Sequence, residues 1–424
     1  MSTDVQLRPL PYPYRAMLAI CSDLDETPDR HVYWSIMRFL NTTEETAMGQ
    51  GVGLEVGNSI YFDMPPGQFA YWNTDDTGRE MVRTLIRSGY IDCLHSYGDL
   101  AETRECASRA VDELERYNCR LEVWVDHRKS PTNFGPDITC GYGDIASSRA
   151  YHADISIAFG IKYIWRGRTT GLLGQNAAVH PLLFVRMFER ASPLVSGRTL
   201  AKEAVKVFLG HVKHPRWQMH ASNSVYRISR LRDGHLVYEF LRADPYFGGQ
   251  SSVDTGDLIG HVLTKRNLDM LVRRKAVWIH YTHLGKVKNS RIPFGEPTQK
   301  AFRLLASYYS DGRILVTTTH RLLRYLTMRD CIQYRAENKG DVLVITIDAA
   351  DDPIRGIRVP LLEELQGITF EVEGKRATDL RLSSSAINVN SKVEHSSGKT
   401  YVSIPWQPLV FPKADLCKGF VNFT

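Results

Sequence analysis

Two short clusters of acidic and imidazole side chains are the residues of this chain best suited to chemistry. Asp23-Leu24-Asp25 and His95-Ser96-Tyr97-Gly98-Asp99 each follow an apolar run that has the character of a buried strand. Hydrolysis at a metal ion needs three protein ligands, an open position for water and a base beside that water. The two clusters can supply all of these groups, so they indicate a metal-assisted hydrolytic site.

The spacing within each cluster favours convergence on one ion. While the chain stays extended, alternation points Asp23 and Asp25 to the same side, so that one can bind a metal and the other can serve as base. The alternative is that an aspartate after a strand caps the next helix. His95 and Asp99 lie four residues apart, and a helical or looped turn directs both side chains toward one ion.

Taken in order, these two motifs resemble those of the polysaccharide deacetylases, the carbohydrate esterase family 4 or NodB-homology enzymes. That family has a base aspartate followed by a metal-binding aspartate, and then a His-(Ser/Thr)-x-x-(His or Asp) motif with two further ligands. The resemblance implies that Asp23 is the base. It also implies that Asp25, His95 and Asp99 bind the metal.

A third motif resembles the family less closely. Trp124-Val125-Asp126-His127-Arg128 stands where the family has an arginine that steadies the base. The resemblance implies this role for Arg128 or for a neighbour such as Asp126. His127 is a candidate substrate contact, and a role as an additional metal ligand is left open.

A late strand resembles the one that carries the family's final histidine, the general acid. It ends in Trp278-Ile279-His280-Tyr281-Thr282-His283, so His280 and His283 compete for this role. They lie three residues apart, and in an extended strand they face opposite sides, so that one of them points at the site. We favour His283 because it is closer to the carboxyl end of the strand.

Two departures from the family bear on the metal. The first motif is spaced Asp-x-Asp, whereas an adjacent pair of aspartates is commoner in the family; the family also shows the spaced variant. The third implied ligand is Asp99, at a position where the family usually has histidine. One histidine with two carboxylates is a harder ligand set, which leaves zinc, manganese or another divalent ion open. We expect one divalent metal ion and favour zinc.

Other polar residues are candidates for substrate binding. Asn133 could contact sugar hydroxyls, although a turn in which the asparagine side chain bonds its own backbone explains it equally. Arg166 and Arg168 follow a strand and could bind a substrate carboxylate or phosphate; the alternative is a solvated loop. A basic segment around residues 202–216 is either the solvated face of a helix or a phosphate contact for an activated sugar.

The elements that must position these residues alternate between strand and helix. Strands are expected at residues 16–21, 53–62, 90–94, 121–125, 161–165, 276–281 and 313–317. Helices are expected at residues 30–40, 79–86, 101–117, 147–159, 257–273 and 297–309. This order predicts an α/β fold, a distorted (β/α)7–8 barrel of the deacetylase type over residues 1–328, with an insertion near residues 170–250. Both acidic clusters fall at carboxyl ends of strands, where such barrels carry their chemistry.

From about residue 330 the pattern changes to short alternating strands separated by Gly, Ser and Asp turns. Strands are expected at residues 342–347, 368–372 and 402–404, and helix signals are nearly absent. We therefore expect a small all-β sandwich domain over residues 329–424. It could bind glycan, cover the barrel or mediate a homodimer.

The composition of the chain limits its expected partners and its expected cellular compartment. The 424 residues carry a formal charge of +6, with no arginine-rich tract or zinc-finger spacing, so we expect no nucleic-acid partner. Seven scattered cysteines without a CxxC pair fit a reducing compartment. The N-terminal residues have no signal-peptide pattern, and no run of about 18 apolar residues occurs. We expect a cytoplasmic protein without a transmembrane segment.

The resemblance implies a metal-dependent hydrolase that removes an N-acyl group, usually acetyl, from an amino sugar during bacterial surface polysaccharide (O-antigen or capsule) biosynthesis. Its substrate would be a nucleotide sugar, a lipid-linked intermediate or a glycan. Two alternatives stay open. One is a non-catalytic carbohydrate-binding protein on a degenerate deacetylase barrel, and the other is a metal-free glycoside hydrolase that uses paired carboxylates.

Overall fold

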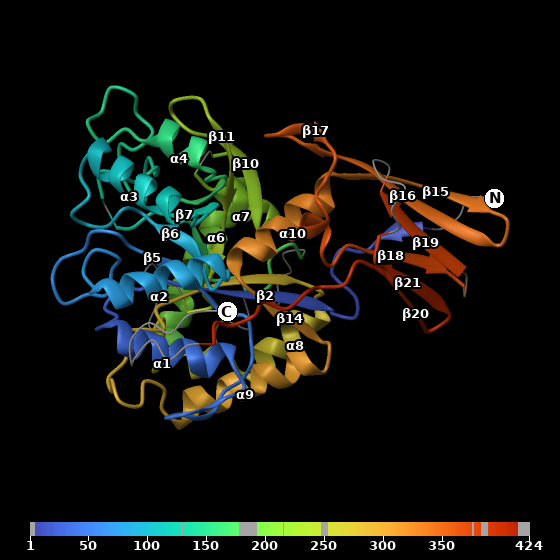
Figure 1. Ribbon diagram of the computed structural model, residues 1–424, viewed down its shortest axis with the longest axis horizontal. Coiled ribbons are helices and arrows are strands. Elements are labelled where there is room, and N and C mark those ends of the chain that lie inside the picture. The colour runs from blue at the N-terminus through green and yellow to red at the C-terminus, as the bar shows by residue number, and fades with distance from the viewer. Residues whose placement is uncertain are drawn as a thin grey trace.

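A parallel β-sheet, curled into a half-barrel, forms the centre of the molecule (Figure 1). The computed structural model describes residues 5–128, 130–177, 193–214, 216–246, 253–374, 377–382 and 389–413. Ten strands of the sheet are parallel, and an eleventh, β10, pairs antiparallel at one edge. The predicted α/β class with barrel-like curvature is confirmed at this level.

The order of strands explains why distant motifs meet. Across the sheet the order is β10 (Tyr226–Arg230), β11 (Leu236–Phe240), β8 (Tyr163–Trp165), β7 (Val123–Val125), β6 (Ile91–His95), β5 (Gly57–Ile60), β2 (Ala16–Ser22), β13 (Val277–Thr282), β12 (Arg242–Ala243) and β9 (Thr169–Thr170). A further strand, β14 (Ile314–Thr317), pairs with the first half of β2. The strands that precede the two acidic clusters and the late histidines are thus close neighbours.

Strand β2 is the centre of this arrangement. All seven of its residues are buried, as expected for a parallel strand that is covered on both faces. Met17, Ala19 and Cys21 face one hydrophobic core, whereas Leu18 and Ile20 face another. Strand β13 pairs along the whole of one edge of β2, while β14 and then β5 pair along the other edge. The residues that follow β2 are therefore rigidly placed.

Helices cover the outside of the curled sheet (Figure 1). They are α1 (Arg30–Asn41), α2 (Asp76–Arg87), α3 (Arg104–Arg116), α4 (Ala153–Phe159), α8 (Lys265–Arg273), α9 (Glu296–Ser310) and α10 (Thr319–Cys331), with a 3-10 turn, η2 (Ile259–His261). In α3 the expected apolar stripe is buried, comprising Ala107, Ala110, Val111 and Leu114. No helix in the described ranges is long and apolar enough to cross a membrane.

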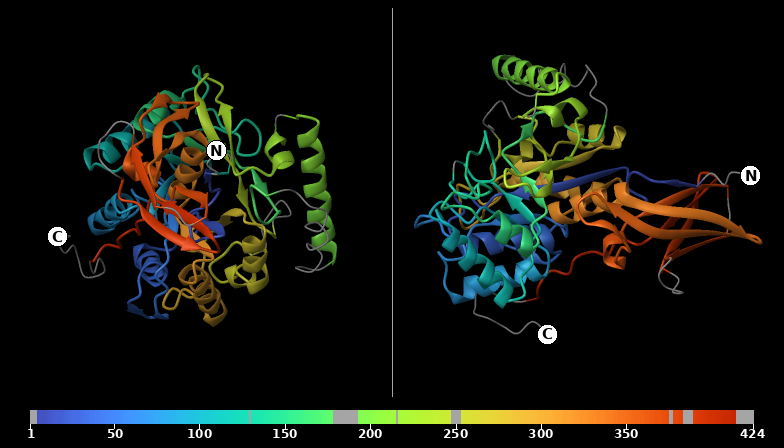
Figure 2. Two further views of the ribbon diagram at one scale, coloured as in Figure 1. Left: turned by 90° about the vertical axis from the view of Figure 1, so that its right-hand side faces the viewer. Right: turned by 90° about the horizontal axis from the view of Figure 1, so that it is seen from above.

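The predicted insertion near residues 170–250 supplies part of the main sheet. Its strands β10, β11 and β12 all belong to that sheet, and β12 lies beside β13. Helix α6 (Pro193–His211) stands at the edge of the molecule, followed by the short α7 (Gln218–Ser222) (Figure 2). Residues 178–192 and 247–252 lie outside the described part of the chain.

Two four-stranded sheets project from the half-barrel after α10 (Figures 1 and 2). They contain β15 (Ile332–Lys339), β16 (Val342–Asp352), β17 (Gly356–Arg358), β18 (Thr369–Glu373), β19 (Ala377–Leu382), β20 (Lys392–Ser396) and β21 (Lys399–Ser403), with a 3-10 turn, η3 (Leu362–Leu365). The N-terminal strand β1 (Val5–Leu7) pairs with β18, so one of these sheets combines a strand from the start of the chain with three strands from its last quarter. A separate small hairpin is formed by β3 (Glu45–Thr46) and β4 (Gly49–Gln50). Helix α10 itself crosses the predicted boundary at residue 328.

Candidate active site

A cavity of about 820 Å³ lies at the carboxyl ends of β2, β6, β7 and β13. These strands run parallel, so the residues that follow them meet at one end of the sheet. The titratable side chains that line the cavity include Asp23, Asp25, His95, His127, Asp254 and His283. The structure therefore brings together the two predicted acidic clusters, the third motif and one of the two late histidines.

Asp23 is held in a fixed orientation directly after β2. Its backbone N–H donates to the Thr282 carbonyl at 2.9 Å, which extends the pairing of β2 with β13. Both carboxylate oxygens lie 2.9 Å from Nη1 of Arg242, and the Ser59 hydroxyl donates to Oδ1 at 3.2 Å. Burial raises the pKa of Asp23, but the charges of Arg242 and His95 outweigh it and hold the pKa below its usual value. Asp23 is therefore ionised.

Arg242 is the arginine that steadies Asp23, a role that the sequence had implied for Arg128. It is fully buried in β12, and its guanidinium carbon lies 3.6 Å from the ring centroid of Trp165 and 4.5 Å from that of Tyr281. These aromatic faces compensate a charge that would be costly to bury alone. Arg128 is exposed at the cavity rim, with left-handed backbone (φ 43°), and its charge acts on Asp99.

Asp25 is the point at which the other groups converge. Its Oδ2 lies 2.9 Å from Nε2 of His127, and the Tyr61 hydroxyl donates to Oδ1. Nε2 of His95 lies 3.8 Å from the same Oδ1. Burial raises the pKa of Asp25, but the hydrogen bond and charge of His127 dominate and lower it. Asp25 is therefore a buried, ionised carboxylate with two imidazoles beside it.

His95 is a buried histidine whose ring makes no hydrogen bond with the described residues. Both ring nitrogens are buried and have no hydrogen-bond partner among the described residues. Nε2 lies 3.3 Å from Oδ2 of Asp23, and the ring stacks on Tyr61 with centroids 4.3 Å apart. Burial lowers the pKa of His95 to about 3, which keeps the imidazole neutral. A neutral imidazole is the form that binds metal ions.

The structure places His127, rather than Asp99, next to Asp25. The carboxylate of Asp99 instead contacts the opposite ring nitrogen of His127, with Oδ1 2.7 Å from Nδ1. The loop after β6 turns through left-handed backbone at Ser96 and Gly98, and a Cβ at Gly98 would lie 2.1 Å from the carbonyl oxygen of Asp63. This tight turn directs Asp99 to the outer side of His127. Burial opposes protonation of His127, but the two carboxylates raise its pKa to about 9.

The donor set of the cavity fits a divalent ion in its chemistry. Within the described part of the chain, no three His, Cys, Asp or Glu side chains are arranged so that they could hold a metal ion as they stand. Asp25, His95 and His127 nevertheless bring one carboxylate and two imidazoles together, a ligand set of hydrolytic zinc sites. The buried ring of His95, which makes no hydrogen bond but has Nε2 beside Asp23 and Asp25, matches such a site, as does the outer carboxylate of Asp99 on His127.

His283 and not His280 faces the cavity. Nδ1 of His283 lies 3.2 Å from Oδ2 of Asp254, and its Nε2 lies 4.0 Å from Oδ2 of Asp25. Burial lowers the pKa of His283, but the hydrogen bond of Asp254 and the charges of Asp25 and Asp23 outweigh it and raise the pKa. His280 is fully buried on the other face of β13, its Nδ1 is 3.3 Å from the Ala243 carbonyl, and burial lowers its pKa to about 4.

Asp126 and Asn133 organise the loop that carries His127. The Asp126 carboxylate accepts four hydrogen bonds at 2.7–2.9 Å, from Trp124 Nε1, Phe134 N, Gly135 N and Thr139 Oγ1. Burial raises the pKa of Asp126 to about 6. The Asn133 side chain bonds both the N–H and the carbonyl of His127, at 3.0 and 2.8 Å. Asn133 therefore bonds the backbone of a residue six positions earlier instead of its own, and both Asp126 and Asn133 position His127.

Arg166 and Arg168 do not line the cavity. Both bind the buried Glu239 of β11, with Nη2 of Arg166 at 2.8 Å and Nε of Arg168 at 2.9 Å. Arg227 joins the same carboxylate at 2.7 Å. The three guanidinium groups are used in this buried cluster, so the predicted contact of Arg166 and Arg168 with substrate is replaced by a structural role.

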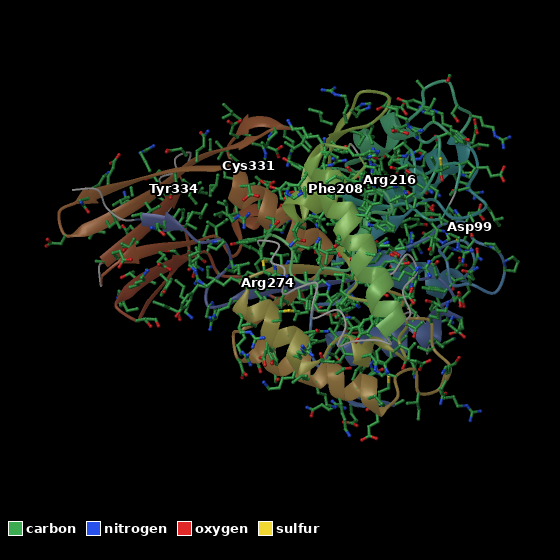
Figure 3. All side chains as sticks on the ribbon, turned by 180° about the vertical axis from the view of Figure 1, so that it is seen from behind. Asp99, Phe208, Arg216, Arg274, Cys331 and Tyr334 are labelled. Carbon is green, nitrogen blue, oxygen red and sulfur yellow. The ribbon has the colours of Figure 1, made fainter. Side chains whose placement is uncertain are left out.

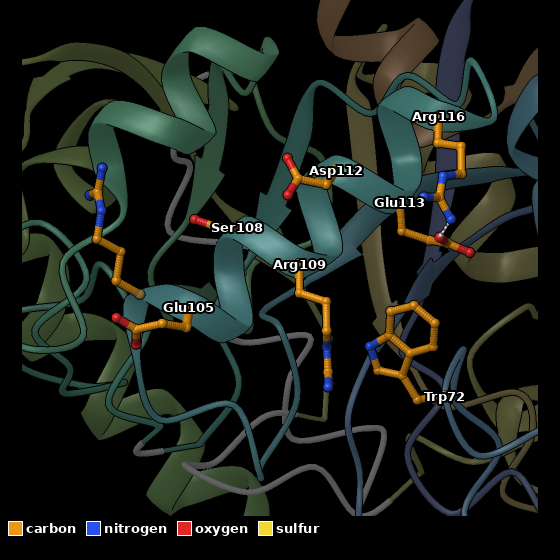
Figure 4. Close-up of a pocket in the computed structure, with 8 residues that line it drawn as sticks. Trp72, Glu105, Ser108, Arg109, Asp112, Glu113 and Arg116 are labelled. Atoms are coloured by element: carbon orange, nitrogen blue, oxygen red, sulfur yellow. Dashed lines mark ion pairs between the residues drawn. The ribbon is translucent and has the colours of Figure 1, made fainter.

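A second hollow, of about 530 Å³, lies along the outer face of α3 (Figure 4). Several of its charged groups are paired with one another or with nearby residues. Arg109 binds Asp63 at 3.0 Å and lies over the ring of Trp72, and Arg116 lies 4.0 Å from Glu113. This hollow has no convergent set of unpaired groups comparable to that of the candidate active site.

Comparison with protein-family models found no match for this chain, and comparison with curated proteins found none either. The geometry of the cavity therefore carries the functional argument.

Proposed function

We propose that this protein is a metal-dependent hydrolase that removes an N-acyl group from an amino sugar. The observation that carries the proposal is a single cavity in which Asp23, paired with Arg242, lies beside the Asp25–His95–His127 cluster. His283, backed by Asp254, lines the same cavity. The proposed general base, the proposed metal ligands and the proposed general acid therefore line the same cavity.

Asp25, His95 and His127 would hold the divalent ion, and the two imidazoles favour zinc. When bound there, the ion would lower the pKa of a coordinated water and polarise the acyl carbonyl. Asp99 keeps the His127 ring oriented through Nδ1, so that Nε2 faces the site.

Asp23 is the general base of the proposed reaction. Its carboxylate is ionised and its orientation is fixed by Arg242 and Ser59, so it can take a proton from the attacking water without first reorganising. The close contact of its Oδ2 with His95, at 3.3 Å, places the base beside the ligand cluster.

His283 is the general acid. The amine expelled from an amide is a very poor leaving group unless it is protonated as the C–N bond breaks. Asp254, Asp25 and Asp23 together favour the protonated imidazole of His283, which supplies that proton. Asp254 also fixes the ring through Nδ1 and leaves Nε2 directed toward Asp25.

The charge state of the carboxylates favours amide hydrolysis over glycoside hydrolysis. A glycosidase needs a carboxyl acid with a raised pKa beside an ionised partner. The pKa values of Asp23 and Asp25 are both lowered. Asp126 has a raised pKa, but its oxygens already accept four hydrogen bonds from the protein.

The proposed setting is bacterial surface polysaccharide (O-antigen or capsule) biosynthesis in the cytoplasm, on a nucleotide sugar, a lipid-linked intermediate or a glycan. A cavity of about 820 Å³ has room for an acylated monosaccharide and part of its aglycone. In this proposal the curled sheet is a deacetylase-type barrel and the C-terminal strands form an accessory β-sandwich.

The first test is metal content and acetate release, measured on protein purified without an affinity tag. We expect a near-stoichiometric divalent ion, and acetate release from at least one N-acetyl amino sugar of a panel. Asp25→Asn should lose both, whereas Asp23→Asn should keep the metal and lose turnover.

Asp112→Asn, an exposed aspartate on α3, is the matched control and should change neither quantity. Protein that remains metal-free after reconstitution, or full turnover by Asp23→Asn, would overturn the proposal.

A further inference from the structure

Helix α6 presents an apolar stripe to solvent. The stripe consists of four apolar residues spaced three or four positions apart, which places them on one side of the helix and on the residue just after it: Ala201, Val205, Phe208 and Val212. The exposed fractions of Val205, Phe208 and Val212 are 55%, 65% and 58%. Figure 3 shows α6 on the outside of the molecule with Phe208 labelled, and Figure 2 shows the helix standing at its edge.

Basic side chains flank this stripe. Arg198 and Lys213 are exposed, and Lys202 and Arg216 are partly exposed. Burial and the charges of Arg198 and Lys206 lower the pKa of Lys202. The acidic residue of the helix, Glu203, is buried on the inner side, where it binds Thr170.

A cavity of about 510 Å³ lies beneath α6. Val205, Trp217 and Ile138 contribute apolar surface to it. Lys202 and Arg216 contribute charge, and Nε of Arg216 lies 3.5 Å from Oδ2 of Asp137. Ile138, Gly167 and Thr169 line both this cavity and the candidate active site. The two cavities thus share a wall, and a molecule whose sugar lay near Asp25 could continue beneath α6.

We propose that α6 binds an anionic lipid surface, and that the cavity beneath it receives the phosphate and the first part of the apolar chain of a lipid-linked amino sugar. The inference rests on the proposed function and names its substrate class. Phe208 and Val212, at one end of the stripe, would enter the boundary between headgroups and acyl chains, while the flanking cations contact lipid phosphates. Ala201 and Val205 line the cavity that receives the apolar chain.

The charges on α6 favour this occupant over the alternatives. A second copy of the chain would bring the same Arg198, Lys202 and Lys213 face to face, which like-charge repulsion opposes. A nucleotide sugar would satisfy the cations but would leave Phe208 and Val212 exposed to water. A lipid phosphate surface satisfies both features together.

Vesicle sedimentation tests the docking surface. The protein should bind vesicles of phosphatidylglycerol mixed with phosphatidylcholine, and should bind phosphatidylcholine alone much less. Phe208→Asp should weaken binding to the anionic vesicles by at least about tenfold, because it replaces inserted apolar surface by a negative charge.

Ile357→Asp, at an exposed isoleucine of β17, is the matched control and should bind as the unaltered protein does. Circular dichroism of both variants confirms their folding. Absence of binding to anionic vesicles, equal binding by Phe208→Asp, or a self-association that Phe208→Asp abolishes would overturn the inference.

A substrate comparison separates this inference from the proposed function. Acetate release is measured from a soluble N-acetyl amino sugar and from the same sugar linked through diphosphate to a lipid in vesicles. Phe208→Asp should reduce turnover of the lipid-linked sugar alone. If the protein binds vesicles but releases acetate from neither substrate, the proposed function fails while the docking surface stands. If Phe208→Asp reduces turnover of both or of neither, the assignment of the substrate class fails.

Discussion

His127 contacts two carboxylates, Asp25 through Nε2 at 2.9 Å and Asp99 through Nδ1 at 2.7 Å. A carboxylate on the far nitrogen of a ligating histidine fixes the ring, and its loss usually weakens metal binding about 10–100-fold. We therefore expect Asp99→Asn to weaken zinc affinity by about 10–100-fold, and His127→Ala to remove tight binding altogether. Competition titration against a chelator measures both. If Asp99→Asn lost zinc affinity as completely as Asp25→Asn, the result would indicate that Asp99 binds the metal directly.

His283 and Asp254 lead to a prediction about pH. The acid must be protonated, so turnover falls as pH rises through the pKa of His283, which Asp254 helps to raise. Asp254→Asn removes that stabilisation, lowers the pKa and should move the alkaline limb of the kcat/KM profile to lower pH. His283→Gln should reduce kcat/KM by about 10²–10⁴-fold. His280→Gln, on the other face of β13, should leave the limb in place, and a shift there would reassign the acid.

The site residues that could be predicted from the sequence lie in different parts of the fold from those that could not. Asp23, Asp25 and His95 end or directly follow buried strands, and parallel pairing alone brings them together. Arg242 lies in β12, a two-residue strand inside the predicted insertion, and its link to Asp23 depends on long-range pairing. An arginine within the apolar run around residues 236–243 was the one local signal for it. Asp254 had no local signal.

At the scale of elements, periodicity located the strands and helices better than it located their connections. The expected helices at 30–40 and 297–309 are α1 and α9, displaced by one residue at most, because a regular apolar stripe marks each. Strands β9, β10, β11 and β12 were not expected. Strands β9 and β12 have two residues each, and β10 is half exposed. Strand β11 is mostly buried, but its place in the sheet, like those of β9 and β12, is set by neighbours that are distant in the sequence.

His152 joins helix α4 to the loop of the third motif. Its Nε2 donates to the Thr132 carbonyl at 2.7 Å, and its Nδ1 lies 2.9 Å from the Ser156 hydroxyl. Burial lowers its pKa to about 4 in the folded protein, below the value of about 6.5 expected when unfolded. At a pH between these two pKa values, His152 is protonated in the unfolded chain but neutral in the folded protein. Stability should therefore fall as pH falls from about 6.5 to about 4, by about 3 kcal/mol in total from this residue.

Urea unfolding near neutral pH and near pH 5 measures this contribution. His152→Gln keeps a hydrogen-bonding side chain but cannot be protonated, so its free energy of unfolding should depend less on pH over this range. It should also be less stable than the unaltered protein at neutral pH, because two buried hydrogen bonds change. An unchanged pH dependence in the variant would show that His152 does not titrate in this way.

The two halves of the molecule are tied together by both ends of the chain. Strand β1 pairs with β18 in a C-terminal sheet, while the segment after β21 returns to the half-barrel. There the Leu409 N–H donates to Glu55 at 2.9 Å, and the Gln407 carbonyl accepts from Arg321 at 2.6 Å. Glu55 and Arg321 form a buried ion pair, so this returning segment helps to satisfy charges inside the α/β half.

The same segment contributes an aromatic anchor, which provides a prediction for the whole molecule. The ring of Phe411 lies 5.2 Å from Trp34 of α1 and 5.1 Å from Tyr90, and Tyr90 donates a hydrogen bond to the Leu409 carbonyl. Phe411→Ala should cost about 1–2 kcal/mol of unfolding free energy, because the ring is partly buried. Val410→Ser, at a neighbour whose side chain is exposed, should cost less than about 0.5 kcal/mol. Urea unfolding followed by Trp fluorescence measures both. If the loss in Phe411→Ala appears in the same cooperative transition that releases the proposed metal ion, the C-terminal segment stabilises the fold that holds the candidate site. A separate transition that leaves the ion bound would show that it does not.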